Sequence, residues 1–329
     1  MQKRNNRWLK GLLAVLLSGA LVLTGCGGQK EEDTSANPQE AVKEFKPLPT
    51  DSTKKVLEYK GGSVAEGELN RYLNLMAFLD QQIGFIIANM KEEESKQFRE
   101  EMAKDLASRR YIATLIQNDA EYGKKADESM KQFESELLGA ASEQDGKGPK
   151  TLDEAIKDKG FAKEDLHRFF VEYHKIEQFL NDRLKNVQVD QVKVQHVLVS
   201  VGDGSEGTVK RTDAEAKKRA DEVKKKLEAG EDFAAIAKQY SDDPGSKDNS
   251  GMYEGDPDQF VPEFANACKT LPIGKISDPV KTQFGYHVMK VTERKKIPAT
   301  QASEEAQMEK KKEIYQQFID KELGARVIA

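Results

Sequence analysis

Residues 192–200, VKVQHVLVS, and residues 282–291, TQFGYHVMKV, begin and end the stretch of sequence that decides the fold. In the first segment, alternate positions from Val192 to Leu198 include His196 and share one face of a strand, because successive side chains point to opposite faces. The second segment predicts another strand, which carries His287. We therefore expect both histidines on strands of one domain.

Between the two strands lie a short acidic loop and an aromatic segment. The loop is YSDDPGS, residues 240–246, and carries Asp243; the segment is DQFVPEF, residues 258–264, and carries Phe260 and Phe264. The stretch has neither the ligand spacing of a metal site nor the sharp turn around a nucleophile that hydrolases use. Two histidines, a carboxylate and an apolar pocket predict a site that binds an amide and twists it without breaking a covalent bond.

Four separated segments of this stretch resemble, in the same order, the parvulin-type peptidyl-prolyl isomerases. They are QHVLVS, FAAIAKQYSDDP, QFVPEFANA and LPIGKISDPVKTQFGYHVMKV, at residues 195–200, 233–244, 259–267 and 271–291. The resemblance implies an α+β fold for residues 189–295, with a four-stranded antiparallel sheet and surrounding helices. It also implies that no cofactor and no metal ion take part.

The resemblance further assigns roles to individual residues. It implies that the catalytic residues are His196, Asp243, Thr282 and His287, and that the substrate-binding residues of the proline pocket are Met252, Phe260 and Phe264. Two positions depart from the family's pattern. The run NSGMYEGDPD around Met252 differs from the usual GGxLG motif, and Phe284 stands where some members have a serine.

The residues taken alone leave other interpretations open. Asp243 precedes Pro244, and an aspartate side chain can form a turn by bonding to the backbone. His196 and His287 can satisfy each other as donor and acceptor and so hold the sheet together. Phe260 and Phe264 have a helical spacing that is also typical of a packed core.

Some parvulins prefer phosphorylated serine or threonine before the proline, and they bind the phosphate with basic residues after the first strand. The corresponding loop here is SVGDGSEGT, residues 200–208, with two acids and no base before Lys210. A phosphate would be repelled by this loop rather than bound. We therefore expect the substrates to be unmodified X-Pro segments.

Residues 1–25 predict a lipoprotein signal peptide. A basic segment, MQKRNNRWLK, precedes the apolar run GLLAVLLSGALVL, which is short for a membrane span. Residues 23–26, LTGC, resemble a lipobox, which implies that Cys26 becomes the N-terminus and carries acyl chains; an uncleaved anchor helix is the alternative. The formal net charge is −5 although the leader contributes only bases, and an acidic chain argues against nucleic acid as a partner.

The remaining segments predict a tether and a helical domain. Residues 26–53 are rich in glycine, proline, serine, threonine and charge, and we expect a disordered tether. Residues 54–188 show apolar stripes at helical spacing, such as the one from Tyr72 to Met90, and predict a chaperone-like domain. The stripes are interpreted as a mutual core or as an apolar cleft for unfolded chains. Residues 296–329 predict a C-terminal helix that docks on this domain, which makes the isomerase domain an insertion.

The order of these segments is similar to that of the PrsA-like foldase lipoproteins of Gram-positive bacteria. The resemblance implies a lipid-anchored foldase at the extracytoplasmic face of the cell membrane that isomerises X-Pro bonds in exported proteins. Its partners would be unfolded or partly folded chains and the lipid bilayer, and a homodimer through the helical domain is compatible with it. The alternative is a holdase chaperone whose parvulin domain is inactive or only binds peptide. A solute-binding lipoprotein would need repeated α/β units, which this sequence lacks.

Overall fold

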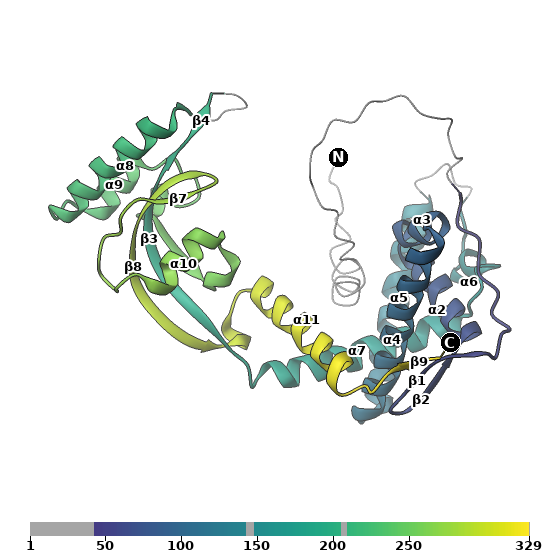
Figure 1. The fold of residues 1–329 in the computed structure, drawn as a ribbon. Helices are drawn as coiled ribbons and strands as arrows, with labels where there is room; N and C mark the ends of the chain where they lie inside the picture. The colour runs from purple at the N-terminus through teal and green to yellow at the C-terminus, as the bar shows by residue number, and fades with distance from the viewer. Residues whose placement is uncertain (1–42, 143–147, 205–208, 329) are drawn as a thin grey trace. The chain divides into compact units, whose positions relative to one another are not determined.

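The computed structural model describes residues 43–142, 148–204 and 209–328, which form two compact units (Figure 1). The helical unit consists of residues 43–183 and 311–328, and the sheet unit consists of residues 184–310. The leader, Cys26 and the first part of the expected tether lie outside the described residues. None of the helices in the described part of the chain is long and apolar enough to cross a membrane.

The helical unit combines long helices with a small three-stranded sheet. Its strands are β1 (Lys55–Tyr59), β2 (Gly62–Ala65) and β9 (Arg326–Val327), in the order β2-β1-β9. Its helices are α2 (Glu66–Leu79), α3 (Gln81–Asn89), α4 (Glu92–Leu115), α5 (Asp119–Ser142), α6 (Leu152–Ile156), α7 (Lys163–Leu184) and the second half of α11 (Glu304–Lys321). Strand β9 pairs with β1, so segments from both ends of the chain enter one sheet.

The apolar stripe between Tyr72 and Met90 belongs to two helices. Asp80 ends α2 in an extended conformation (φ −137°, ψ 110°), and its carboxylate accepts a hydrogen bond from the Gln82 N–H at the start of α3. An aspartate in this position satisfies a free N–H group of a helix N-terminus and so favours the break. The spacing of apolar residues continues across the break and gives no sign of it.

The ordered unit begins before residue 54, where we expected the tether to end. Residues 43–53 run as an extended chain along α2, and the backbone of Leu48 both donates to and accepts from the side chain of Asn74 (2.8 and 3.0 Å). Asn70 donates to the carbonyl of Pro49 at 2.7 Å. Both asparagines are buried, and buried amides need such partners. Composition did not predict this order because the hydrogen bonds come from side chains on a distant helix.

The C-terminal segment contributes to the core of the helical unit. The Tyr315 hydroxyl on α11 donates to the buried carboxylate of Asp105 on α4 at 2.8 Å. The fully buried Phe318 ring lies 5.2 Å from the ring of Phe179 on α7 and 5.8 Å from that of Tyr111 on α4. The sheet unit extends to residue 310 rather than 295, because the last strand continues to Pro298 and α11 begins within this unit.

The sheet unit contains a four-stranded antiparallel sheet, and it confirms the α+β fold class. The strands are β3 (Gln188–Ser200), β6 (Met252–Gly255), β7 (Val280–Thr282) and β8 (Gly285–Pro298), in the order β6-β3-β8-β7. The helices are α8 (Asp213–Glu228), α9 (Phe233–Tyr240) and α10 (Pro262–Thr270). A short antiparallel pair of strands, β4 (Gly202–Asp203) and β5 (Lys210–Arg211), precedes α8. Pro262 occupies the first turn of α10, where its missing N–H is harmless.

The two faces of this sheet have separate cores. Val197 and Val199 on β3 and Val288 on β8 pack under α8 and α9. Residues of opposite parity, including Val194 on β3 and Met289 on β8, pack under α10. The alternation predicted for residues 192–198 is therefore confirmed, and it directs His196 toward the α10 face.

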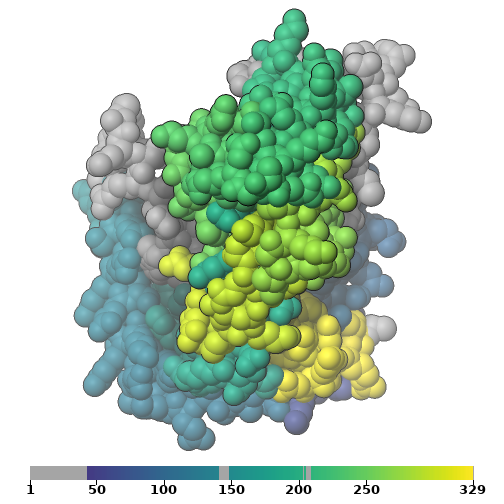
Figure 2. Space-filling model, turned by 90° about the vertical axis from the view of Figure 1, so that its left-hand side faces the viewer, coloured from purple at the N-terminus to yellow at the C-terminus, as the bar shows by residue number. Residues whose placement is uncertain are grey.

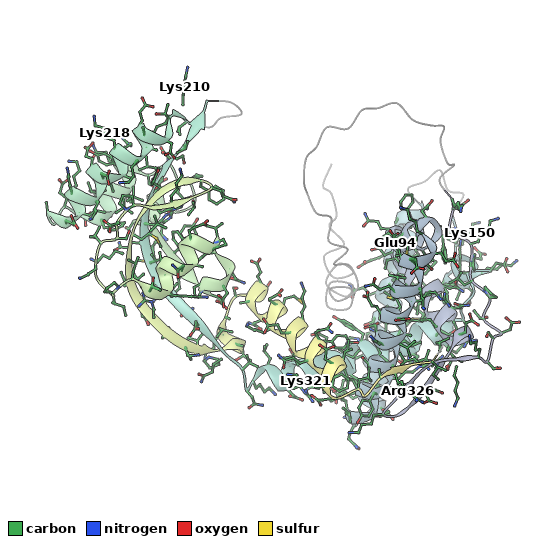
Figure 3. All side chains as sticks on the ribbon, viewed as in Figure 1. Glu94, Lys150, Lys210, Lys218, Lys321 and Arg326 are labelled. Carbon is green, nitrogen blue, oxygen red and sulfur yellow. The ribbon has the colours of Figure 1, made fainter. Side chains whose placement is uncertain are left out.

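Helix α8 begins at the capping box that the sequence predicts. The Thr212 hydroxyl accepts from the Glu215 N–H at 3.3 Å, and the Glu215 carboxylate accepts from the Thr212 N–H at 2.9 Å. Helices α8 and α9 turn their polar outer surface toward the viewer in Figure 2. Charged residues such as Lys218 on α8 and Glu94 on α4 point away from the ribbon (Figure 3) and are exposed.

Candidate active site

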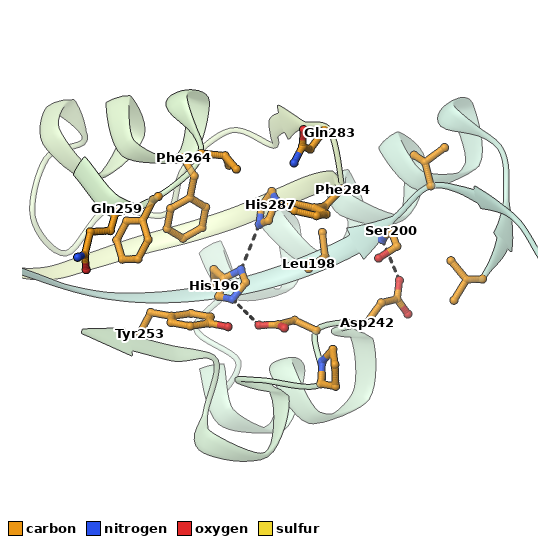
Figure 4. Close-up of a pocket in the computed structure, with 16 residues that line it drawn as sticks. His196, Leu198, Ser200, Asp242, Tyr253, Gln259, Phe264, Gln283, Phe284 and His287 are labelled. Carbon is orange, nitrogen blue, oxygen red and sulfur yellow. Dashed lines mark hydrogen bonds and ion pairs between the residues drawn. The ribbon is translucent and has the colours of Figure 1, made fainter. Parts of the chain in front are cut away.

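His196 and His287 meet on the α10 face of the sheet, at the centre of the sheet unit (Figure 4). His196 lies on β3, and His287 lies on β8 opposite Leu198. Their Nδ1 atoms are 3.1 Å apart, and both side chains are buried. The ring of Phe264 on α10 stands edge-on to both imidazoles, with ring centroids 5.3 and 5.2 Å away. The pair is thus enclosed by the sheet below and the aromatic helix above.

Each histidine uses its second ring nitrogen to bind a residue outside the pair. His196 Nε2 lies 3.0 Å from the Asp243 carboxylate and 2.9 Å from the Ser246 hydroxyl. His287 Nε2 lies 2.8 Å from the Thr282 hydroxyl, which in turn accepts from the Phe284 N–H at 3.1 Å. A continuous chain of hydrogen bonds therefore crosses the sheet, from the turn after β7 to the loop after α9.

The chemistry of the groups at the two ends of this hydrogen-bond network decides which atom is the donor in each bond. The carboxylate of Asp243 can only accept, so His196 Nε2 carries the proton and His196 Nδ1 accepts from His287 Nδ1–H. His287 Nε2 then accepts from the Thr282 hydroxyl. Every donor points toward Asp243, and every ring nitrogen is satisfied with both imidazoles neutral.

Electrostatics agree with this assignment. The hydrogen bond from His196 is the main cause that holds the pKa of the Asp243 carboxyl well below its usual range, against the opposing effect of burial; hydrogen bonds from Ser246 and the Gly245 N–H act in the same direction. Burial, reinforced by the neighbouring His196, lowers the pKa of His287 to about 3. At neutral pH the site therefore contains one carboxylate charge beside an uncharged His287.

Asp243 is both a turn residue and a member of this network. Its Oδ1 accepts from the Gly245 N–H at 3.1 Å, as the turn interpretation requires, while its Oδ2 accepts from His196 and Ser246. Gly251 brings the next strand close to the histidines. Its φ is +70°, and a β-carbon there would come within 2.3 Å of the His196 carbonyl oxygen, so only glycine fits.

A cavity of about 740 Å³ opens beside Asp243 and the two histidines. At one end, Tyr253, Phe260 and Phe264 form an aromatic pocket, in which the Phe260 and Phe264 rings are 5.3 Å apart and the Tyr253 and Phe260 rings 6.4 Å apart. The Tyr253 ring also packs on His196 at 5.2 Å. This end offers apolar ring faces directly beside the hydrogen-bond network.

The charge at the cavity is negative. Asp242 and Asp243 line it, and among the described residues no lysine or arginine does. The nearby Arg211 is engaged by the Asp242 carboxylate and by the Ser200 carbonyl, to which it donates at 2.9 Å. Its charge is therefore neutralised within the protein, which leaves no free cation at this cavity in the part of the chain that the structure describes.

Comparison with known proteins identifies the sheet unit. Residues 176–295 match the family model of the PPIC-type PPIase domain. A foldase protein PrsA of Clostridium botulinum is 28% identical over 88% of this chain and 85% of its own length, and the foldase protein PrsA 4 of Bacillus cereus is 36% identical over 50% of this chain and 53% of its own. A crystal structure of the PrsA peptidylprolyl isomerase from Bacillus cereus covers 82% of this chain and 87% of its own at 25% identity, with a TM-score of 0.35.

The chain is similar to the PrsA foldases over most of its length and carries a PPIC-type PPIase domain. Its sheet unit is a parvulin-type peptidyl-prolyl cis-trans isomerase domain, and the match begins within α7. The isomerase assignment follows from the family model and the foldase relatives. The geometry described above shows which of the candidate site residues meet at the cavity.

The parvulin domain brings five of the seven expected site residues to the cavity. His196, Asp243, Phe260, Phe264 and His287 all line the cavity. Thr282, which we expected among the catalytic residues, is buried, is hydrogen-bonded to His287 and does not line the cavity.

Met252 does not line the cavity, although we expected it in the proline pocket. It pairs with Gln195 on β3, and its neighbour Tyr253, which pairs with Val194, lines the cavity instead. Successive strand residues point to opposite faces, so a shift of one residue decides which side chain reaches the pocket. The departure from the GGxLG motif at this strand was the sequence feature that could have indicated a different pocket residue here.

Ser246 belongs to the hydrogen-bond network of the candidate site, and the sequence motifs did not point to it. Its side chain is fully buried, donates to Asp243 and lies 2.9 Å from His196 Nε2. The Asp-Pro-Gly-Ser turn returns Ser246 to the side chain of Asp243, three residues before it. A turn motif that starts with a candidate site residue is the signal that could have found it.

Proposed function

We propose that this chain isomerises X-Pro bonds in unmodified, exported polypeptides while it is held at the outer face of the cell membrane by acyl chains on Cys26. The observation that carries the proposal is the Asp243 carboxylate beside an aromatic pocket, in a cavity that no lysine or arginine lines among the residues described by the structure. The family relationship supports the isomerase reaction, and the leader sequence supports the anchor.

The reaction rotates a partial double bond against a barrier of about 18–20 kcal/mol. The proline ring of the substrate fits the aromatic pocket of Phe260, Phe264 and Tyr253, because flat apolar faces suit its methylene groups. Its imide bond then lies beside Asp243 and His196. The chemistry needs no proton transfer, and a site that binds the twisted imide more strongly than the planar one accelerates the rotation.

Asp243 supplies this difference through its negative charge. In the planar imide, resonance places negative charge on the carbonyl oxygen, and the twisted imide loses that resonance. A carboxylate near the oxygen therefore raises the free energy of the planar state more than that of the twisted state. The depressed pKa of Asp243 keeps the charge in place throughout the neutral range. His196 and Ser246 hold the carboxylate in a fixed orientation.

Unmodified substrates suit the electrostatics of the cavity. A phosphate before the proline would meet Asp242 and Asp243, and Arg211 is already paired with Asp242. Repulsion without a compensating cation disfavours binding. Extended, proline-containing chains that emerge from an export machinery are the substrates that need this catalyst, because uncatalysed isomerisation takes tens to hundreds of seconds.

The experiment that tests this proposal measures cis–trans exchange by NMR in two peptides. One peptide contains Ser-Pro, and the other contains phosphoserine before the same proline. The proposal expects faster exchange in the Ser-Pro peptide and little acceleration in the phosphorylated one. Equal or greater acceleration of the phosphorylated peptide would contradict the substrate class.

A further inference from the structure

Helix α3 of the helical unit exposes apolar side chains that a solvated helix usually replaces by charged ones. Its sequence, QQIGFIIAN, contains no charged residue, and its buried residues are Ile83 and Gly84. Phe85 is 54% exposed. Half-buried apolar side chains follow it at Ile86, Ile87 and Met90. Only one edge of this apolar helix packs against the helical unit, and its other side needs a partner.

The first described residues of the chain join the helical unit at α3. The Lys43 N–H donates to the side-chain oxygen of Asn89, the last residue of α3, and the Lys43 carbonyl accepts from the side-chain nitrogen of Asn89, each at 3.0 Å. Phe45 packs closely on the same helix, because a β-carbon at Gly84 would lie 3.3 Å from that of Phe45. Figure 1 shows α3 at one end of the helix bundle. The chain that comes from Cys26 thus enters about one turn from Phe85.

The length of chain before Lys43 sets how far α3 can lie from the bilayer. Lys43 is the seventeenth residue after Cys26. A chain of this length spans at most about 60 Å, and the coil that its composition predicts spans about 23 Å. With acyl chains on Cys26, α3 therefore stays close to the membrane surface. A contact that would be weak between free molecules is favoured here, because the tether makes it intramolecular.

The charges around α3 have both signs and do not favour anionic lipid. The exposed bases are Lys43, Lys46 and Lys91, and the exposed acids are Glu44, Glu92, Glu93 and Glu94. The three acids of residues 92–94 stand in the first turn of α4, where they suit the helix dipole. Burial of apolar surface, rather than attraction between charges, is therefore the force that can bring this end of the helical unit to a bilayer.

We propose that α3 lies in the interfacial region of the lipid bilayer with Phe85 inserted among the acyl chains, as a second contact between the chain and the membrane. The inference rests on the membrane anchoring in the proposed function and adds a binding surface to it. A helix of nine residues is about 13 Å long, so α3 is too short to span the bilayer and suits the interface. The contact orients the helical unit with its α3 end toward the lipid.

A single indole on α3 tests this contact. The chain has one tryptophan, Trp8 in the leader. The full chain with Trp8→Phe and Phe85→Trp is reconstituted into phosphatidylcholine vesicles, with and without phosphatidylglycerol, and its fluorescence is compared between plain and brominated acyl chains. We expect blue-shifted emission and at least about twofold quenching by the brominated chains. Both effects should be the same in the two lipid mixtures, because burial of apolar surface drives the contact.

The matched control is Leu115→Trp in the same Trp8→Phe chain. Leu115 is 45% exposed and ends α4, at the opposite end of that helix from α3. Its indole should keep the emission of a solvent-exposed group and should not be quenched. Gln82→Trp, at an exposed position one turn before Phe85, should report the same insertion as Phe85→Trp. It decides the test if melting curves show that Phe85→Trp does not fold.

Equal quenching at positions 85 and 115, or no quenching at positions 82 and 85, would overturn the contact. A blue shift without vesicles that grows with protein concentration and resists brominated lipid would assign α3 to a second copy of the chain, and this would overturn the contact as well. The readout requires neither catalysis nor acylation, because the leader also holds the reconstituted chain at the bilayer. Failure of the anchor would appear in cell fractionation, whereas failure of the α3 contact would appear as an unquenched indole.

Discussion

The hydroxyl of Tyr315 on α11 donates to Asp105 on α4 at 2.8 Å, and the Tyr72 hydroxyl donates to the other oxygen of the same carboxylate at 2.5 Å. All three residues are buried, and the fully buried Arg109 stabilises the charge of Asp105 although burial raises the pKa of that carboxyl. One buried carboxylate thus joins a C-terminal helix to α2 and α4. The C-terminal segment belongs to the helical unit through this contact as well as through β9.

Tyr315→Phe should destabilise the helical unit by about 1–3 kcal/mol, because it removes a donor from a buried carboxylate without opening a cavity. Hydrogen exchange should speed up at amides of α2 and α4 and stay unchanged at amides of β3 and β8. Tyr173→Phe on α7 is a control for loss of a hydroxyl, since no hydrogen bond of that hydroxyl contributes to this cluster. Unchanged protection in α2 and α4 would show that the contact contributes nothing.

The stability of the sheet unit should fall as the pH is lowered from 6.5. His287 has a pKa of about 3 in the folded chain and an ordinary value near 6.5 when unfolded, so below pH 6.5 only the unfolded state takes up the proton. The free energy of unfolding should therefore decrease with a slope approaching about 1.4 kcal/mol per pH unit. Asp243 adds to the loss only below its ordinary pKa, because its folded value is depressed.

Hydrogen exchange of β3 and β8 amides between pH 6.5 and 4.5, corrected for the intrinsic rate, measures this slope. His287→Leu should remove the part of the slope that this imidazole contributes, whatever it does to stability at pH 7. A wild-type unit whose protection is constant over this range would refute the assignment of a neutral, buried His287.

His196→Ala should mainly cost stability. It leaves the His287 Nδ1–H without its acceptor and removes the main hydrogen bond to Asp243, and an unsatisfied buried donor costs about 1–3 kcal/mol. Denaturant unfolding of the sheet unit gives the free energy directly. A variant as stable as the wild type would show that the hydrogen-bond chain does not hold the sheet together.

Cys26→Ala should release the protein from membranes or leave its leader uncleaved, as the lipobox at residues 23–26 implies. Fractionation of cells and the migration of the protein on a denaturing gel measure both effects. Gly25→Ser is the control, because it keeps the Cys26 thiol and a small residue before it. A Cys26→Ala protein that fractionates and migrates like the wild type would contradict the anchor.

Much of the parvulin domain follows from local sequence rules. The alternation of β3 places His196 on the same face as Val194, and four motifs in the family's order predict the sheet that brings His196 to His287. Such patterns report which residues share a face. They do not report register, which is why Tyr253 rather than Met252 reaches the pocket.

The features that the sequence did not predict depend on contacts between distant residues. Residues 43–53 are ordered because Asn70 and Asn74 bind their backbone, and no local property of the segment reveals those partners. The extension of the sheet unit beyond residue 295 likewise depends on the pairing of Gln188 with Pro298. Tertiary hydrogen bonds decide these boundaries.

If Asp243 and the aromatic pocket accelerate the rotation, exchange in an unmodified Ala-Pro peptide should depend on both. Asp243→Asn keeps the shape of the side chain and removes its charge, and Phe264→Leu keeps an apolar side chain but removes the ring. Each should lower the exchange rate about tenfold or more, a change of about 1.4 kcal/mol in barrier height. Asp248→Asn, at an exposed acid that does not line the cavity, is the matched control and should retain the wild-type rate.

Two-dimensional exchange NMR on the wild type and these variants, with melting curves recorded alongside, is the deciding measurement. We expect catalysis by the wild type and by Asp248→Asn, and a rate at least about tenfold lower for a folded Asp243→Asn variant. A folded Asp243→Asn variant that matches the wild-type rate would contradict it.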